Sequence, residues 1–222
     1  MNAGDPRELV AKIRRAVLDG QFAAGQRLVE SELCELYDVS RSTVRQALRE
    51  LLADGLVEVQ RNKGARVRVI STAEAVEITE VRMVLEGLLA AKAAERVTPG
   101  QAERLLEIRR AMRERVEGHD PLGYSDLNAV LHALVQEIAG QDTARTILAR
   151  LQGQLVRHQF RLSLQPGRST VSLVQHERII DAIVARDQEA AEAAMRAHLR
   201  DVITQISGFT PPPSPTGVLS RS

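Results

Sequence analysis

The chain has 222 residues, of which 44% are hydrophobic and 27% charged, an ordinary globular balance. Aromatic residues make up only 2%, so the core must be aliphatic, and the strong use of Ala and Arg favours helices. A single cysteine excludes an internal disulfide and a cysteine-based metal site, which fits a reducing cytoplasm. The charged amino terminus excludes a signal peptide, and no apolar run approaches the ~20 residues of a membrane span. We therefore expect a cytoplasmic protein with no membrane partner.

The net charge of +1 is unevenly distributed along the chain. Residues 1–70 contain 12 Lys or Arg against 10 Asp or Glu, whereas residues 71–222 contain 18 against 19. Within 41–68 alone, seven basic residues face three acidic ones. A basic front and a nearly neutral remainder indicate that only the amino-terminal part meets a polyanion.

Residues 1–70 predict a winged helix-turn-helix domain. Apolar residues at helical spacing predict a helix over 6–19, and a second helix that Ser31 caps and that turns Leu36 inward. The segment 40–55 predicts a third helix. The stretch VEVQRNKGARVRVI then alternates apolar and polar residues around a turn, as a short β-hairpin does. Three helices followed by a hairpin, in that order, describe this fold.

The third helix has two distinct faces. Ser40 is expected to cap it and Gly55 to end it. The residues expected to face the core are Val44, Leu48, Leu51 and Leu52. On the other face, arginines recur every four positions, at Arg41, Arg45 and Arg49. An arginine row can be a merely solvated face, but a short helix, a tight turn and a basic hairpin around it favour a helix that enters the major groove of DNA.

The residue types at this surface suit nucleic acid. Arginine can bind guanine O6 and N7 bidentately, and Ser or Thr suits phosphates or base edges. At the hairpin tip, glycine allows a close backbone approach and lysine suits the minor groove or a phosphate. The residues expected to contact double-stranded DNA are Ser40, Arg41, Ser42, Thr43, Arg45, Arg49, Lys63 and Gly64.

Residues 71–208 predict an all-helical bundle of about six helices, so the fold class is mainly α. The sequence STAE at 71–74 has the pattern of a capping box and opens a long helix over roughly 73–96. Four helices joined by short turns follow, and Asp187 begins the last one. The Pro- and Ser-rich residues 209–222 predict a disordered tail.

Three of the five histidines have informative positions. His176 lies 11 residues before Asp187 and His198 lies 11 after it. If Asp187 marks the turn of a helical hairpin, both imidazoles lie about 16 Å from the turn, at matched height. Asn128 and His132 are four apart and share a helix face. Three imidazoles and an oxygen ligand could bind Zn²⁺, Ni²⁺ or a similar divalent ion, although helical histidines can equally be ordinary core or surface residues. The other two are expected at the surface: His119 and His158.

The stretch GQFAAGQRLVESELCELYDVSRSTVRQALRELLADGLVEVQRNKGARV resembles the winged-helix domain of the GntR family of bacterial transcription regulators. The segment EITEVRMVLEGLLAAKAA and the late histidines resemble the FadR subfamily of that family, with its FCD-type effector domain. The two resemblances together cover roughly residues 7–207. They imply DNA contacts by Arg41, Thr43, Arg45, Arg49 and Gly64.

The resemblance also implies a metal ion. Many FCD-type domains bind one through an acidic residue, a histidine four positions later and two histidines from the last two helices. Three positions match: His132, His176 and His198. Asn128 stands where Asp is commoner. In this family the metal commonly helps to hold a small carboxylate effector, which a divalent ion on neutral imidazoles favours. Arg82 is a candidate second clamp on the carboxylate, and a helical pair with Glu86 is the alternative for it.

These features predict a ligand-responsive regulator rather than an enzyme. It would bind a pseudo-palindromic operator as a homodimer, since two-fold operators mirror two-fold proteins. One alternative is a regulator with a vestigial, metal-free histidine site, which Asn128 favours. The other is a metal-dependent hydrolase fused to a DNA-binding domain, although the chain has no HExxH motif. The effector, the operator, and the choice between repression and activation stay open in the sequence.

Overall fold

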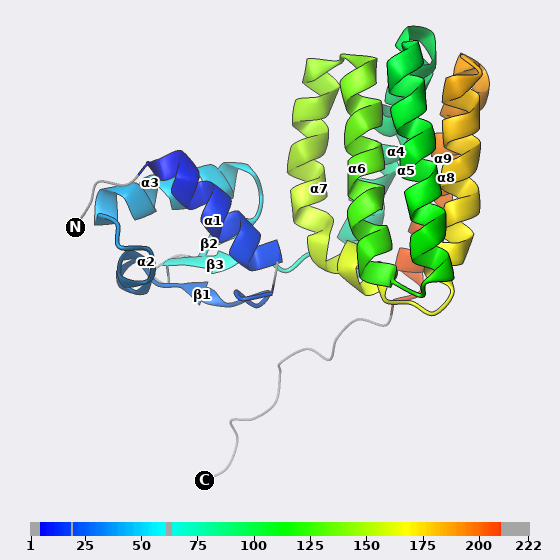
Figure 1. The fold of residues 1–222 in the computed structure, drawn as a ribbon. Coiled ribbons are helices and arrows are strands. Elements are labelled where there is room, and N and C mark those ends of the chain that lie inside the picture. The colour runs from blue at the N-terminus through cyan, green and yellow to red at the C-terminus, as the bar shows by residue number, and fades with distance from the viewer. Residues whose placement is uncertain (1–4, 19, 61–63, 210–222) are drawn as a thin grey trace.

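The apolar stripes of the amino-terminal part meet in a small aliphatic core. The computed structural model describes residues 5–18, 20–60 and 64–209, and within them this part has three helices and three short strands. These are α1 (Pro6–Leu18), β1 (Arg27–Leu28), α2 (Glu30–Tyr37), α3 (Arg41–Ala53), β2 (Val57–Gln60) and β3 (Gly64–Val67). Figure 1 shows them beside a separate helical bundle. The predicted winged helix-turn-helix is confirmed.

The hairpin is part of a three-stranded antiparallel sheet with β3 in the middle. Val57 pairs with Val67 across the hairpin, and both are buried. On the other edge of β3, Leu28 of β1 pairs with Ala65. The sequence reading missed β1, because a strand of two residues is too short to show a period-2 pattern.

Three details of the predicted helices were wrong. α2 begins at Glu30 after Val29, which makes no side-chain cap bond, so Ser31 lies in the first turn and is not the cap. Leu36 and Leu52 were expected to face the core, but they are 63% and 42% exposed. Helical spacing identifies an apolar stripe but does not fix its width, and this small core covers only the middle of the stripe.

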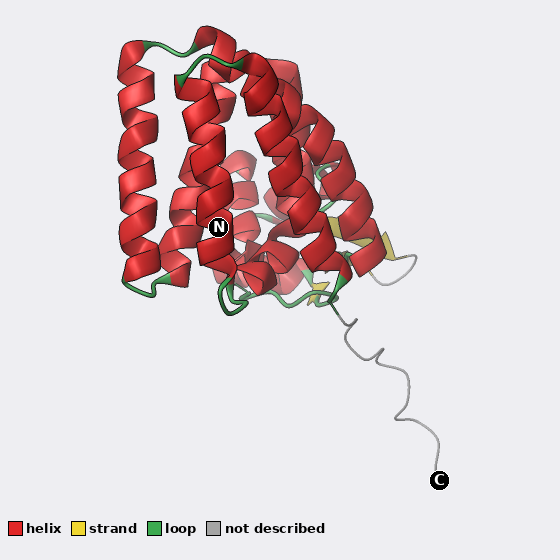
Figure 2. Cartoon of the chain, turned by 90° about the vertical axis from the view of Figure 1, so that its right-hand side faces the viewer, coloured by secondary structure: helices red, strands yellow, loops and turns green. Residues whose placement is uncertain are grey.

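The second part of the chain is the predicted bundle of six helices. Within the described residues they are α4 (Thr72–Arg96), α5 (Pro99–Glu117), α6 (Pro121–Ala139), α7 (Asp142–Ser163), α8 (Arg168–Val184) and α9 (Gln188–Ser207). Figure 2 shows them running side by side as a single group of helices. None of the helices in the described part of the chain combines the length and the apolar character that crossing a membrane would need.

The turn between α8 and α9 sets the register of these two helices. Asp187 is the N-cap of α9, and its side chain accepts a hydrogen bond from the backbone N–H of Ala190. Arg186, just before it, has a left-handed backbone with φ of 60°. The Arg186 guanidinium donates to the backbone carbonyls of Val97 and Glu95 after and at the end of α4, at 2.9 and 3.0 Å. The turn is thereby tied to the bundle, and the two helices start from a fixed point.

α7 lies on the side of the bundle that faces the winged helix (Figure 1). The Gln154 side chain donates to the backbone carbonyl of Asp54 at 3.3 Å and accepts from Arg68 at 3.1 Å. A Cβ atom added to Gly55 would lie 2.7 Å from the Gln154 amide nitrogen, and the Gly55 φ of +70° also disfavours other residues. Gly55 therefore ends α3 and also allows α7 to seat against it.

His158, expected at the surface, is buried at this same junction. One of its ring nitrogens, Nε2, lies 3.0 Å from the carbonyl oxygen of Ile70, which directly precedes the capped start of α4. Its ring stacks on Phe209, which is also buried. The rest of the predicted tail, 210–222, lies outside the described residues.

Candidate functional site

The structure confirms that Ser40 caps α3. Its side chain accepts a hydrogen bond from the backbone N–H of Thr43 at 3.2 Å, and its hydroxyl lies 2.7 Å from that of Ser42. The cap holds the first turn of α3 rigidly, which is the part of a recognition helix that reaches base edges.

The three arginines of α3 share one exposed face. Arg41, Arg45 and Arg49 are all exposed, while Val44 and Leu51 on the opposite face are fully buried. The Arg45 guanidinium pairs with the Glu30 carboxylate of α2 at 2.9 Å. Both side chains are well exposed, so this pair costs little to exchange for a phosphate or a base.

The other predicted DNA contacts lie in different environments. Ser42 is exposed and Ser40 is half-buried. Thr43 is only 5% exposed and its hydroxyl lies 2.8 Å from that of Ser40, so its side chain is part of the cap and not of the exposed face. Gly64 is exposed at the start of β3 with φ of +78° and open space around it. Lys63 lies outside the described residues.

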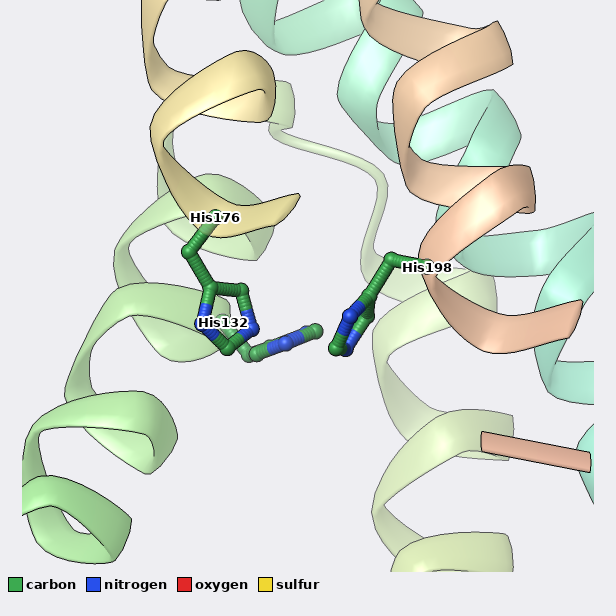
Figure 3. A group of neighbouring side chains, drawn as sticks. All are labelled: His132, His176 and His198. Atoms are coloured by element: carbon green, nitrogen blue, oxygen red, sulfur yellow. The ribbon is translucent and has the colours of Figure 1, made fainter. Parts of the chain in front are cut away.

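In the bundle, the three predicted histidines come together. His132 of α6, His176 of α8 and His198 of α9 are all buried, and their candidate ligand atoms lie within 4.8 Å of one another (Figure 3). The ring centroids of His176 and His198 are 4.5 Å apart, and His132 lies 5.6 and 5.7 Å from them. The matched height that the spacing about Asp187 predicted is present.

Each of the three imidazoles is oriented by a partner at its Nδ1 atom. Nδ1 of His132 lies 2.7 Å from the Glu86 carboxylate. Nδ1 of His176 lies 2.8 Å from the Tyr124 hydroxyl, and Nδ1 of His198 lies 2.8 Å from the Gln175 amide oxygen. Because each Nδ1 is engaged, Nε2 is the atom that each ring has left for a metal, as in histidine metal sites with outer-shell partners. The three partners are Glu86, Tyr124 and Gln175.

Burial keeps two of these rings neutral. It lowers the pKa of His176 and of His198 well below their ordinary range, and the neighbouring His132 and Arg168 lower both further. Burial likewise raises the pKa of Tyr124, so its hydroxyl keeps its proton. Neutral imidazole carries the free lone pair that a metal requires, so the site is in the ligating state at neutral pH.

Arg82 forms the helical pair with Glu86 that was the alternative to its role as a clamp. The two groups are 2.8 Å apart and almost fully buried. Burial acts to raise the pKa of Glu86, but Arg82 and His132 outweigh it and lower this pKa to about 2. Glu86 is therefore a carboxylate that holds Arg82 and His132 together, and Arg82 still lines the pocket beside the histidines.

Two buried polar atoms at the cluster have no partner in the structure: Nε2 of His176 and Oδ1 of Asn128. A buried polar atom without a hydrogen bond is costly, and functional sites are where such atoms are found. Both atoms are donors of the kind that borderline divalent ions such as Zn²⁺ accept. The residues present therefore fit a metal, with Asn128 as a neutral oxygen ligand.

The histidine cluster lines a pocket of about 430 Å³ between α6, α7, α8 and α9. Its polar lining includes Arg168, whose guanidinium pairs with the Asp201 carboxylate, and Ser172. Partial burial acts to raise the pKa of Asp201, but hydrogen bonds from Arg168 and Gln175 lower it. A cavity of this size with a few convergent polar groups suits a small organic ligand. Sequence reasoning missed Glu86 as a histidine partner, together with Tyr124, Gln175 and Arg168.

Comparisons with known proteins agree with this division of the chain. A family model described as bacterial regulatory proteins, gntR family, matches residues 6–67. A second model, the FCD domain, matches residues 77–201. These matches place the arginine row in the first family region and the histidine cluster in the second.

Similar proteins are described as regulators. The chain is 32% identical over 202 residues to an uncharacterized HTH-type transcriptional regulator in an unstable DNA locus of Streptomyces ambofaciens, covering 90% of this chain and 84% of that protein. It is 26% identical over 226 residues to a putative L-lactate dehydrogenase operon regulatory protein of Escherichia coli K12, covering 91% and 86%. A crystal structure of a putative transcriptional regulator GntR from Rhodococcus sp. RHA1 shares 26% identity, with a TM-score of 0.71 and coverage of 92% and 98%.

Proposed function

Since the chain belongs to the GntR family of bacterial transcriptional regulators and carries an FCD domain after its winged helix, we propose that a small carboxylate bound among the histidines controls its binding to DNA. The observation that carries this proposal is the buried cluster of His132, His176 and His198, which opens into a pocket of ligand size. The similar proteins are regulators, and we propose no catalytic role. Its place of action would be the cytoplasm, where the operator lies.

We propose that the winged helix reads a pseudo-palindromic operator through the first turns of α3. The exposed arginines would bind guanine edges or phosphates, and the serines of the cap would bind phosphates. Gly64 and Lys63 would bring the hairpin against the minor groove or a phosphate. Thr43 would contribute by holding the cap. The proposed contact residues are Ser40, Arg41, Ser42, Arg45, Arg49, Lys63 and Gly64.

Arg45→Ala should weaken operator binding by about 1–3 kcal/mol if Arg45 binds a base bidentately. The measurement is a gel-shift titration of the full chain on the DNA upstream of its own gene, with scrambled competitor at physiological ionic strength. Lys12→Ala is the matched control, because Lys12 is an exposed cation of the same domain that pairs with Glu8. Unchanged affinity in Arg45→Ala would remove Arg45 from the reader. A wild-type chain that does not prefer its own upstream DNA to scrambled DNA would contradict the proposed function.

We propose that the homodimer forms through an exposed apolar stripe on α4. Val81, Val84 and Leu88 recur at helical spacing there, and they are 50%, 50% and 39% exposed. A chain of 24.4 kDa should therefore sediment at about twice that mass. Val84→Glu should shift it toward the monomer, and Ile147→Glu, on an exposed position of α7, should not. A monomeric wild-type chain at micromolar concentration would contradict the dimer.

We propose that His132, His176 and His198 hold a divalent ion, Zn²⁺ or Ni²⁺, with the Asn128 oxygen as a fourth ligand. The two partnerless atoms at the cluster support this reading. When bound, the ion would supply positive charge for an anion. The Asn128 oxygen is a neutral donor and supports the second candidate, a regulator that binds its effector at these histidines without metal. Metal analysis of the purified chain, before and after chelator treatment, separates the two.

The proposed effector is a small carboxylate. Arg82 and Arg168 add positive potential to the pocket, even though each has an acidic partner. Arg82 is proposed as an effector contact on this ground. One similar protein is named for an L-lactate dehydrogenase operon, so lactate, a 2-hydroxy carboxylate, is the first probe. Its binding to the metal-loaded chain should raise the melting temperature.

A further inference from the structure

The histidine-lined pocket is not built from the bundle alone. It opens between α6 and α7, on the side of the bundle that faces the winged helix (Figure 1). Its lining there includes Gln136 of α6 and Gln152 of α7, and then Arg14 of α1, which belongs to the DNA-binding domain. A guanidinium group from one domain therefore forms part of the wall of a pocket in the other.

Gly153 allows this approach. A Cβ atom added to Gly153 of α7 would lie 3.6 Å from the Arg14 guanidinium and 3.8 Å from the Leu56 side chain. The missing side chain lets α1 come close to α7 beside the mouth of the pocket. Arg14 is held there by the Asp54 carboxylate at 2.5 Å.

The Arg14 pair differs from the other arginine pairs at the pocket. Arg82 and Arg168 are 6% exposed, so releasing either from its acid would strand a charge. Arg14 is 32% exposed, and Asp54 has a second cation, Arg150, at 3.8 Å. If Arg14 leaves, Asp54 keeps a positive neighbour. Arg14 is therefore the cation of this pocket wall that a ligand can take at the smallest cost.

We propose that Arg14 is an effector contact: a second acidic group of the bound effector pairs with the Arg14 guanidinium and takes it from Asp54. The inference rests on the proposed function, because it assumes a carboxylate at the histidines. It names the effector class more closely, as an acid with an anionic group at each end. Arginine and carboxylate form paired hydrogen bonds, so this contact selects for the second carboxylate.

The exchange would also carry a signal to the reader helix. Asp54 is the C-cap of α3, and its carbonyl accepts the hydrogen bond from Gln154 of α7. Through Arg14, an anion in the pocket bears directly on the contact between α7 and the end of α3. This provides the differential contact with two arrangements of the domains that ligand control requires.

The test compares lactate with malate, which is lactate carrying one further carboxylate. Calorimetric titration of the full, Zn²⁺-loaded chain should give malate about tenfold tighter binding than lactate, the usual contribution of a charged hydrogen-bonded pair. Arg14→Ala should bind lactate as before and lose the preference for malate. Arg14→Lys, which keeps the charge but not the fork of donors, should recover part of it.

Arg150→Ala is the matched control. It also removes a cation from Asp54, but Arg150 is not among the residues that line the histidine pocket, so the preference for malate should stay. Equal loss in Arg14→Ala and Arg150→Ala would overturn the inference, as would a wild-type chain that binds both acids equally. In that last case lactate still binds, and the proposed function stands. If neither acid binds the wild-type chain, the carboxylate effector itself is contradicted.

Discussion

His176→Ala should release the bound metal and abolish the response to lactate. His176 is fully buried, its Nε2 atom has no partner, and it lies between the other two imidazoles. Removing it leaves two histidines and a neutral amide, and two neutral nitrogen ligands hold a divalent ion far more weakly than three. Elemental analysis should fall from about one equivalent of metal per wild-type chain to a trace. The rise in melting temperature with lactate should disappear with it.

His119→Asn is the control for this change. His119 is an exposed imidazole after α5 with φ of 56°, and Asn tolerates that left-handed backbone. It should keep the metal and the lactate response. Retention of a full equivalent of metal by His176→Ala would contradict the site. A lactate response in the wild-type chain that survives complete removal of metal would favour the metal-free regulator.

Arg82→Leu should destabilise the bundle by about 3–5 kcal/mol, because it leaves the buried Glu86 carboxylate without its guanidinium partner. Glu86 is 2% exposed and cannot recover the loss from water. The measurement is urea unfolding in the presence of chelator, so that metal binding does not enter. Arg113→Leu provides the comparison, since Arg113 pairs with Glu177 at the surface and its loss should cost at most about 1 kcal/mol.

Similar losses of stability in the two variants would show that the Arg82 pair is not a buried one. A loss in Arg82→Leu below 1 kcal/mol would have the same meaning. In either case His132 would have to be oriented by something other than an ionised Glu86.

The sequence carried the features of this protein that depend on short spacings. Ser40 before a helical stripe predicted a cap, and the structure has it. The equal distances from Asp187 to His176 and His198 predicted that two imidazoles meet, because two antiparallel helices have the same rise per residue. The positions of Leu36 and Ser31 were wrong, since a stripe of apolar residues does not fix how much of it neighbours cover or where the first helical turn begins.

The features that failed to appear in the sequence depend on packing between distant segments. Glu86 lies 46 residues from His132, and Tyr124 lies 52 residues from His176. Nothing in either local pattern marks these residues as partners, because a carboxylate on a helix is usually solvated and a tyrosine usually fills a core. The inclusion of Arg14 in the wall of the pocket requires the docking of two domains, which no spacing encodes.

The anchored turn between α8 and α9 limits how this part of the chain can change in length. Each residue of a helix advances the backbone by about 100° of rotation. A single-residue insertion or deletion between the turn and either His176 or His198 would swing that imidazole off the cluster, while hydrophobicity and helix propensity could remain perfect. Surface loops elsewhere tolerate such changes, so evolution within this segment should proceed by substitution, and an indel there would be a sign that a descendant no longer senses through these rings.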